Sequence, residues 1–375
     1  MESDLALLPI YLAESSDYLL INEEPSSKFH NYLNRLEINV PNIISKQSLV
    51  HFSKSPFDIE KLLPWGWSPA EHTILKPLKK YCSDSFKHSP IFNWKDEYRH
   101  LYSKKFALQI LQQLIVENDF TDVIKTEMIG RVCFSKSEIE ALLRKWNNLM
   151  IKAPWSSSGR GLQPVTKVPV HDKVWEKILG IINDQGCVLV EPLLNKTFDL
   201  AFQFKLEKEK ISYLGISHFT TDKKGQYQGN YLNGLPDELS YELKDFLSRI
   251  PDLILPSLIK ILEQSELAKK YEGNFGVDTL IFWDNDFKLR INPCLEINVR
   301  QNMGLLSLQI EKLISPEEKG IFQMYYNPKK SFTEFVREME SKFPLAILNQ
   351  KIKKGFFPLT DFSPNKMFGA YIFVP

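Results

Sequence analysis

An apolar run, a lysine and a loop of small residues follow one another between Leu149 and Gly161. The run ends at Lys152, and the stretch Ser156–Gly161 contains three serines and two glycines. A loop of this composition can bring backbone N–H groups close to phosphate oxygens, with the lysine as a positive point charge beside them. The segment is therefore either a polar hairpin turn or a loop that binds phosphate.

This segment differs from two common phosphate-binding motifs. In the P-loop, G-x-x-x-x-G-K-[ST], the lysine follows the glycines, whereas Lys152 precedes Gly159 and Gly161. The dinucleotide fingerprint G-x-G-x-x-G requires a third glycine, and Pro164 occupies that position. A phosphate loop here would be of a different kind.

A second segment, Lys288–Arg300, alternates apolar and polar side chains. At the two-residue period of a strand, one face would carry Leu289, Ile291, Leu295, Ile297 and Val299. The other face would carry Arg290, Asn292, Glu296, Asn298 and Arg300. The oxygens of Glu296 and Asn298 suit a hard cation such as Mg²⁺. The alternative is a solvated sheet face whose charges pair with one another, and Pro293 indicates an edge or a bulge because it cannot donate a ladder hydrogen bond.

Asp278 lies in a neighbouring strand-like run that begins at Gly276. The sequence Asp284–Asp286 is typical of a turn, so the chain should return as the 288–300 strand and form a hairpin. This hairpin would bring Asp278 beside Glu296. Two carboxylates and one amide would then make a single oxygen-rich metal site.

Alternating helices and strands must position these residues, which predicts an α/β protein. Periodicity predicts helices over residues 68–81, 96–118, 136–146, 170–183 and 236–270. It predicts strands over residues 18–21, 36–40, 187–194, 277–283 and 287–299. Ser135 and Glu138 form the Ser-x-x-Glu pattern that begins a helix.

Composition excludes several classes of protein. At 375 residues the chain is long enough for two or three domains of about 100–150 residues each. The 47 basic and 46 acidic residues give a net charge of +1, which provides no field to gather nucleic acid or an acidic membrane. The four cysteines form no C-x-x-C pair, so neither a disulfide framework nor a zinc site is indicated.

Targeting signals are also missing from the sequence pattern. The short apolar stretch Leu5–Ala13 has an acidic start, unlike a signal peptide. No apolar run approaches the roughly 20 residues of a membrane helix. We therefore expect a cytoplasmic protein.

The order of a lysine-led loop, a V-E-x-x strand, G-x-D and E-x-N-x-R resembles the ATP-grasp superfamily. No single motif is highly specific, so the resemblance rests on the ordered set, over roughly residues 100 to 305. It implies that Lys152 contacts the ATP phosphates and that Lys104, or its neighbour Lys105, is an earlier phosphate-contacting lysine. It implies a flexible loop that closes over the phosphates and consists of Ser156, Ser157, Ser158, Gly159, Arg160 and Gly161.

The resemblance also implies the rest of the nucleotide site. Glu191 and Leu193 would lie in the inter-domain hinge that receives the adenine. Asp199 falls near the acidic residue that binds the ribose hydroxyls, although Glu is more common there. Adenine, ribose and phosphates would thus each have a candidate partner.

The metal site and the catalytic residues follow in the same way. Asp278, Glu296 and Asn298 match the metal-binding trio of the superfamily. Arg300 resembles an arginine that meets phosphate or the substrate carboxylate, and we expect Arg300 and Arg290 to be catalytic.

The implied fold is an N-terminal α/β domain (1–95), a central ATP-grasp lobe (96–187) and a C-terminal lobe with the metal-binding sheet (188–375). The implied activity is an ATP- and Mg²⁺-dependent ligase that joins a small-molecule or peptide carboxylate to an amine, thiol or other nucleophile. Alternatives are a kinase of the same fold and a non-catalytic nucleotide-binding protein. A homo-oligomer is one option for its assembly.

Two features remain outside this pattern. His218 is either a structural histidine or a group that reaches the acceptor site. The Pro-Trp-Gly-Trp sequence of Pro64–Trp67 resembles a segment of uncharacterised bacterial relatives, and it can equally be a turn with two packed tryptophans.

Overall fold

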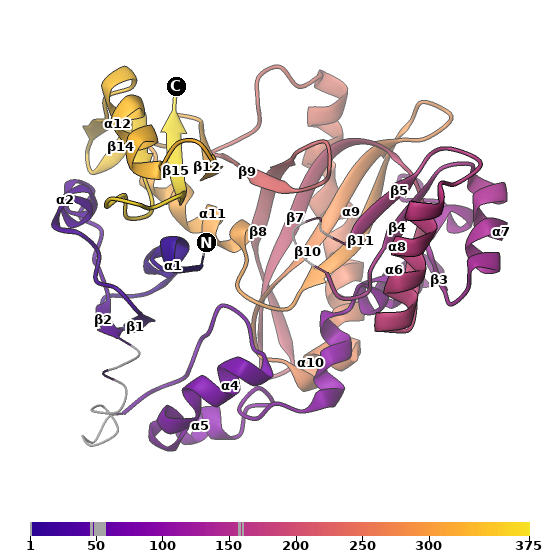
Figure 1. Ribbon diagram of the computed structural model, residues 1–375, viewed down its shortest axis with the longest axis horizontal. Helices are drawn as coiled ribbons and strands as arrows, with labels where there is room; N and C mark the ends of the chain where they lie inside the picture. The colour runs from indigo at the N-terminus through magenta and orange to yellow at the C-terminus, as the bar shows by residue number, and fades with distance from the viewer. Residues whose placement is uncertain (1, 46–47, 49–57, 157–158, 160) are drawn as a thin grey trace.

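The computed structural model describes residues 2–45, 48, 58–156, 159 and 161–375. In this part of the chain the strands form one sheet of nine, one sheet of four and one pair. Helices cover parts of both sheets (Figure 1). The α/β class expected from the sequence is confirmed. None of the described helices is long and apolar enough to span a bilayer.

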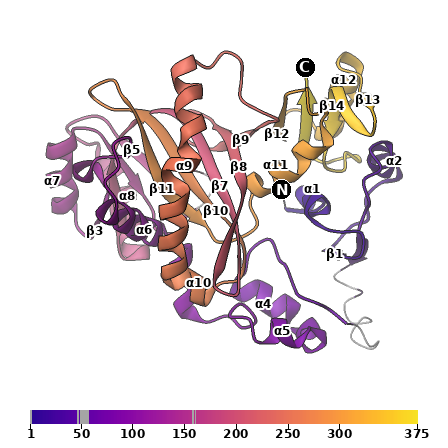
Figure 2. The same ribbon diagram turned by 180° about the vertical axis from the view of Figure 1, so that it is seen from behind.

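The nine-stranded sheet runs in the order β11-β10-β7-β8-β9-β12-β15-β14-β13. Its strands are β7 (Asn195–Glu207), β8 (Lys210–Thr221), β9 (Tyr227–Leu232), β10 (Gly273–Trp283), β11 (Leu289–Asn298), β12 (Gly320–Tyr326), β13 (Ala346–Leu348), β14 (Lys351–Pro358) and β15 (Phe368–Val374). Phe202 and Phe204 of β7 point into a core on one side, so Asp199 points to the opposite side. Helix α9 (Tyr241–Gln264) lies across the core side, beside α6 (Lys104–Glu117) and α10 (Glu266–Lys270) (Figure 2).

The four-stranded sheet has the order β3-β6-β4-β5 and lies beyond the β11 edge of the large sheet (Figure 1). It consists of β3 (Arg131–Cys133), β4 (Leu149–Lys152), β5 (Leu162–Val165) and β6 (Val188–Pro192), with helices α7 (Lys136–Trp146) and α8 (Asp172–Gln185) and the short η4 (Thr126–Met128) nearby. Its core contains Ile139, Ile151, Trp175 and Val190. Since Leu189 pairs with Lys152 in the strand register, β6 belongs to this sheet. The central lobe therefore extends to Pro192 rather than ending at residue 187.

Residues 2–45 pack against the C-terminal strands. They form α1 (Glu2–Leu5), η1 (Leu8–Leu12), β1 (Tyr18–Ile21), α2 (Ser27–Arg35) and β2 (Asn42–Ser45). Phe29 and Leu33 of α2 share a core with Phe356 and Phe357 of β14. The C-terminal half of this unit also contains α11 (Met303–Ile310), η5 (Glu311–Leu313) and α12 (Phe332–Lys342).

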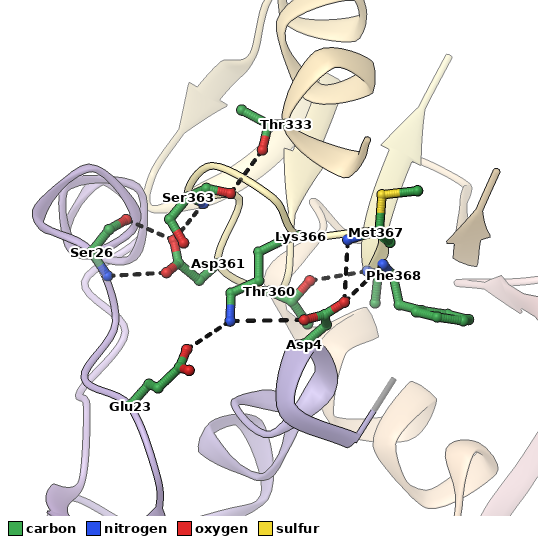
Figure 3. A network of polar contacts seen from close by, with 11 residues as sticks. Asp4, Glu23, Ser26, Thr333, Thr360, Asp361, Ser363, Lys366, Met367 and Phe368 are labelled. Carbon is green, nitrogen blue, oxygen red and sulfur yellow. Dashed lines mark hydrogen bonds and ion pairs between the residues drawn. The ribbon is translucent and has the colours of Figure 1, made fainter. Parts of the chain in front are cut away.

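Polar contacts join the same two parts of the chain (Figure 3). The Asp4 carboxylate accepts hydrogen bonds from the backbone N–H groups of Met367 and Phe368, at 3.2 and 3.1 Å. The Ser26 hydroxyl donates to Asp361 Oδ1 at 2.6 Å. By contrast, α4 (Pro69–Leu75), η2 (Lys76–Tyr81) and α5 (Asp84–Lys87) pack against the core of the large sheet. The described residues up to 45 and those from 58 to 95 thus have different cores, unlike the single domain expected for 1–95, because each segment buries its apolar face against a different part of the sheet.

Several predicted elements are present with altered boundaries. The helix expected over 96–118 is divided into η3 (Asp96–Tyr102) and α6, because Ser103 is extended and its hydroxyl accepts from the Lys105 N–H at 3.2 Å. The helix expected over 68–81 becomes α4 and η2. The strand expected over 36–40 is replaced by β2, since Glu37 has a φ of 51° and Pro41 follows.

Candidate active site

The β10–β11 hairpin brings two acidic side chains together. Asp278 is directly opposite Glu296 in the strand register, and Gly276 is opposite Asn298. Directly opposite residues of an antiparallel pair have Cβ atoms about 5 Å apart. The sequence-predicted neighbourhood of Asp278, Glu296 and Asn298 is therefore present, on the face of the sheet away from α9.

A bulge at Pro293 alters the rest of the predicted polar face. On β10, Asp278 and Leu280 are two residues apart. Their partners on β11, Glu296 and Asn292, are four residues apart, so β11 holds two extra residues here. Asn292 is consequently buried, and its Oδ1 accepts from the Cys294 N–H at 3.4 Å. The alternation read from the sequence is interrupted within this bulge, because Cys294 joins the core of the large sheet and Leu295 does not.

The bulge also separates Arg290 from the acidic pair. Arg290 Nε lies 2.8 Å from Asp284 Oδ2, and its guanidinium also donates to the carbonyl of Thr121. These contacts hold Arg290 at the turn of the hairpin, six residues and up to about 20 Å along the strand from Glu296. The structure does not bring Arg290 to the candidate site, where a catalytic role was expected for it.

Lys104 is the first residue of α6, and its ammonium reaches the acidic pair. Its Nζ lies 2.9 Å from Glu296 Oε1 and 2.6 Å from the carbonyl oxygen of Ser156. The backbone N–H of Lys104 donates to the Pro154 carbonyl at 2.9 Å, which fixes the helix N-terminus beside the end of β4. Lys104 rather than Lys105 therefore faces the cluster, and only 5% of the residue is exposed.

Lys152 ends β4 and forms the second lysine–carboxylate pair. Its Nζ lies 2.6 Å from Glu191 Oε2, across two neighbouring strands of the four-stranded sheet. Lys152 is buried, and the Glu191 side chain is 14% exposed. Leu193, two residues further, is exposed and donates its backbone N–H to the Asn148 carbonyl at 3.0 Å.

Asp199 lies on the same face of the large sheet as Asp278, because Ala201 is opposite Asp278 and Asp199 is two residues along β7. Its Oδ2 accepts from Lys196 Nζ at 2.5 Å and from the Thr221 hydroxyl at 3.0 Å. The residue is only 8% exposed, so its carboxylate is held in place by these two donors.

The small-residue loop approaches the opposite lobe. Gly159 has a φ of 72°, and a Cβ added there would lie 2.9 Å from the carbonyl oxygen of Gly225, in the turn between β8 and β9. Ser156 donates to the Ala153 carbonyl at 3.3 Å, and Gly161 accepts from the Ala153 N–H at 2.9 Å. The remaining predicted loop residues lie outside the described part of the chain: Ser157, Ser158 and Arg160.

Arg300 follows β11 and remains beside the acidic pair. Its guanidinium donates to Asn298 Oδ1 at 3.0 Å and to the Gln301 carbonyl at 3.1 Å. A Cβ added to Gly66 would lie 3.1 Å from Arg300 Cβ, so the Pro64–Trp67 turn packs directly on this arginine. No spacing signal in the sequence points to that contact, because the two residues are far apart in the chain.

The cluster strongly raises the pKa of one carboxyl, that of Asp278. Burial, followed by the neighbouring charge of Glu296, raises the pKa of Asp278 to about 7, and Asn298 and Arg300 oppose the shift. An additional cation would favour ionised Asp278, since opposite charge stabilises a carboxylate.

His218 does not reach this cluster. It is opposite Leu200 in the β7–β8 register and lies on the core side of the sheet, near the ring of Phe198 at 5.8 Å. Burial lowers its pKa to about 4, so it stays neutral at physiological pH. These observations agree with the structural alternative. Lys223 and Lys224 are exposed in the β8–β9 turn.

A comparison of the sequence with models of known protein families finds no match, and a comparison with curated proteins finds none either. Solved structures do match. A biotin carboxylase from Campylobacter jejuni, solved as a β-γ-ATP complex, has a TM-score of 0.56 and 13% identity, covering 100% of this chain and 85% of that chain. A second match is the biotin carboxylase domain of a Hydrogenobacter thermophilus 2-oxoglutarate carboxylase, solved with MgADP, ADP and bicarbonate. Its TM-score is 0.54 and its identity 10%, with 100% of this chain and 84% of that chain covered.

A third similar structure is the N5-carboxyaminoimidazole ribonucleotide synthetase from Thermus thermophilus. Its TM-score is 0.50 and its identity 11%, with 99% of this chain and 90% of that chain covered. At such identities the likeness concerns the fold. The chain therefore has the ATP-grasp fold that its ordered motifs predicted.

Proposed function

We propose that this protein is an ATP- and Mg²⁺-dependent ligase that joins a carboxylate to an amine or another nucleophile through an acyl phosphate. The observation that carries the proposal is the 2.9 Å contact between Lys104 and Glu296, which unites residues 192 positions apart in one polar cluster. The similar biotin carboxylase domain supports the proposal. It has a similar fold and was solved in complex with MgADP, ADP and bicarbonate.

The residues of the cluster fit a magnesium ion. Asp278, Glu296 and Asn298 offer carboxylate and amide oxygens, the ligands that Mg²⁺ prefers, and they would hold the ion together with phosphate and water. When bound, Mg²⁺ supplies positive charge to the oxygens of the transferring phosphoryl group.

The remaining groups fit ATP. Lys104 and Lys152 would bind phosphate oxygens of the nucleotide. These contacts would replace part of their present contacts with Glu296 and Glu191. The hinge around Glu191 and Leu193 would receive the adenine, and Asp199 would accept hydrogen bonds from the ribose. The described loop residues Ser156, Gly159 and Gly161 would lie over the phosphates.

The reaction would proceed in two displacements. A substrate carboxylate oxygen attacks the γ-phosphorus, the bond to the β–γ bridging oxygen breaks, and ADP leaves. The acceptor nitrogen then attacks the acyl carbon, phosphate leaves, and the nitrogen loses a proton. Arg300 would orient the substrate carboxylate, and the two lysines would stabilise the charge that develops on the phosphoryl oxygens.

Trapping with hydroxylamine tests this chemistry. Hydroxylamine should convert an acyl phosphate to a stable hydroxamate, so incubation with ATP, Mg²⁺, hydroxylamine and a panel of carboxylic acids should yield both a hydroxamate and ADP. Mass spectrometry of the product and an ADP assay measure the two yields. Omission of ATP or Mg²⁺ should abolish both.

Lys104→Ala and Lys105→Ala form a matched pair for this experiment. The first should lose hydroxamate formation, because its ammonium contacts Glu296, whereas the second should retain it. A phosphorylated product that hydroxylamine does not trap would identify a kinase instead. Equal activity of the two lysine variants would show that the cluster is not the phosphate site.

Metal binding should be linked to proton release from Asp278. Because its pKa is raised to about 7, this carboxyl is mostly protonated at pH 6 and mostly ionised at pH 8. A metal ligand must be deprotonated, so MgADP affinity should fall as the pH decreases through about 7. Binding should release more protons at pH 6 than at pH 8. Calorimetry in buffers of different ionisation enthalpy measures this release. Proton release that is the same at both pH values would contradict the assignment.

A further inference from the structure

The Pro64–Trp67 turn is anchored to the protein at its second tryptophan. The Trp67 ring stacks on His72 with centroids 4.4 Å apart and packs near Phe86 at 6.4 Å. Trp67 is only 7% exposed, and Ser68 caps the following helix by accepting from the Glu71 N–H at 3.2 Å. The turn therefore has a fixed position relative to the body of the molecule.

Gly66 presses against the aliphatic stem of Arg300. A Cβ at this position would lie 3.1 Å from Arg300 Cβ, 3.5 Å from Cδ and 3.9 Å from Cγ. The backbone of Gly66 is not among those with positive φ, so the glycine is required here for space and not for its conformation. A side chain at residue 66 would have to displace the stem of the arginine.

The two hydrogen bonds of the Arg300 guanidinium go to neutral oxygens, those of Asn298 and Gln301. Its charge also acts on the nearby Asp278 carboxyl, whose pKa it lowers, but no hydrogen bond joins Arg300 to a carboxylate of the described residues. The residue is half-buried. A partly desolvated guanidinium with donors to spare is well suited to bind a carboxylate.

An aromatic side chain that has no partner among the described residues lies next to the Gly66–Arg300 contact in the chain. Trp65 precedes Gly66, is half-buried, and has no ring contact or hydrogen-bond partner for its indole N–H within the described chain. Tyr271 is a buried core residue whose pKa Arg300 lowers, so the arginine lies within electrostatic range of it. Trp65 is therefore the aromatic side chain that could meet the substituent of a carboxylate bound by Arg300.

We propose that the Pro64–Trp67 turn is the specificity-determining wall of the acyl-substrate site, with Gly66 positioning Arg300 and the indole of Trp65 covering a planar apolar substituent of the carboxylate. This proposal rests on the ligase function proposed above and adds a substrate class to it, namely carboxylates that bear an aromatic ring. Ring-on-ring contact and burial of apolar area favour such substrates over small aliphatic acids.

Equilibrium binding of simple carboxylates tests the proposal without knowledge of the natural substrate. The probes are phenylacetate, cyclohexaneacetate and acetate, titrated calorimetrically into the full chain with Mg²⁺ and a non-hydrolysable ATP analogue. Phenylacetate should bind at least about 10-fold more tightly than acetate and more tightly than cyclohexaneacetate. Trp65→Ala should reduce the phenylacetate preference to about unity, and Trp65→Phe should retain most of it.

Gly66→Ala tests the positioning of Arg300 separately. It should weaken phenylacetate and acetate by a similar factor of about 10, because the displaced guanidinium is common to both, while the affinity for the ATP analogue stays unchanged. Gly180→Ala is the matched control, since a Cβ at Gly180 meets nothing within 4 Å. Its carboxylate affinities should equal those of the wild type.

The outcomes separate the two proposals. If the ATP analogue does not bind, the ligase function fails and the substrate class fails with it. If the analogue binds but phenylacetate and acetate bind equally, or neither binds, only the aromatic specificity is overturned. A phenylacetate preference that survives in Trp65→Ala would overturn the role of the turn.

Discussion

Glu296→Gln is expected to abolish Mg²⁺-dependent ADP release, with kcat/KM reduced by at least about 1000-fold. The reason is that a bound metal ion contributes several kcal/mol to the transition state of phosphoryl transfer. Glutamine keeps the shape of the side chain and can still accept the hydrogen bond from Lys104, which spans 2.9 Å in the wild type, so the fold should persist. Asn298→Ala should act in the same way, because it removes the neighbouring amide oxygen. Steady-state ADP release against Mg²⁺ concentration measures both effects.

Asp286→Asn provides the matched control for Glu296→Gln. It makes the same carboxylate-to-amide change in the same hairpin, but the Asp286 side chain is 64% exposed and pairs with Lys125. Its activity and Tm should equal those of the wild type. Full activity of both Glu296→Gln and Asn298→Ala would remove the proposed metal site. A lowered Tm in either variant would indicate that its lost activity reflects damage to the fold.

Lys152→Met should weaken ATP binding by about 10- to 100-fold and slow turnover, because charge-assisted contacts to phosphate are lost. It should also lower the free energy of unfolding. Glu191, 2.6 Å from Lys152 and 14% exposed, would remain as a nearly buried carboxylate without its partner. Breaking such a pair typically costs about 3–5 kcal/mol. Titration with a fluorescent ATP analogue and thermal unfolding measure the two effects separately.

The double variant Lys152→Met with Glu191→Gln separates binding from stability. It removes both charges, so the Tm should recover towards the wild-type value, whereas the ATP affinity should stay low. The hinge keeps its backbone groups in this variant. If the ATP affinity recovers together with the Tm, Lys152 neutralises the charge of Glu191 and does not bind the nucleotide.

Local sequence signals predicted the secondary structure where the capping or turn chemistry was strong. Ser135 begins α7 as expected, accepting from the Glu138 N–H at 3.4 Å, and the Asp284–Asp286 turn closes the β10–β11 hairpin. The turn and the period-two pattern predicted that Asp278 and Glu296 would be neighbours, whereas the register that places them directly opposite depends on the bulge in β11. These features depend on residues close in sequence, which is why the sequence could predict them.

Breaks within predicted elements were harder to read. Ser103 fits a helical pattern as well as a cap, and the fold selects the cap because Lys104 must donate its N–H to Pro154. Pro293 signalled an irregularity in β11, but neither the size of the bulge nor the isolation of Arg290 follows from one proline. Such outcomes are decided by pairing with a neighbouring strand.

The sequence by itself determined the ordered set of chemical groups: a lysine before a small-residue loop, a strand that carries a glutamate, and a hairpin with two carboxylates and an amide. Only the tertiary structure decided which distant groups meet. It selected Lys104 over Lys105, paired Lys152 with Glu191, and divided the described residues up to 45 and those from 58 to 95 between two cores. It also brought Gly66 against Arg300. Periodicity specifies the face on which a side chain lies, whereas contacts between distant segments depend on how apolar faces pack, and no local pattern encodes that packing.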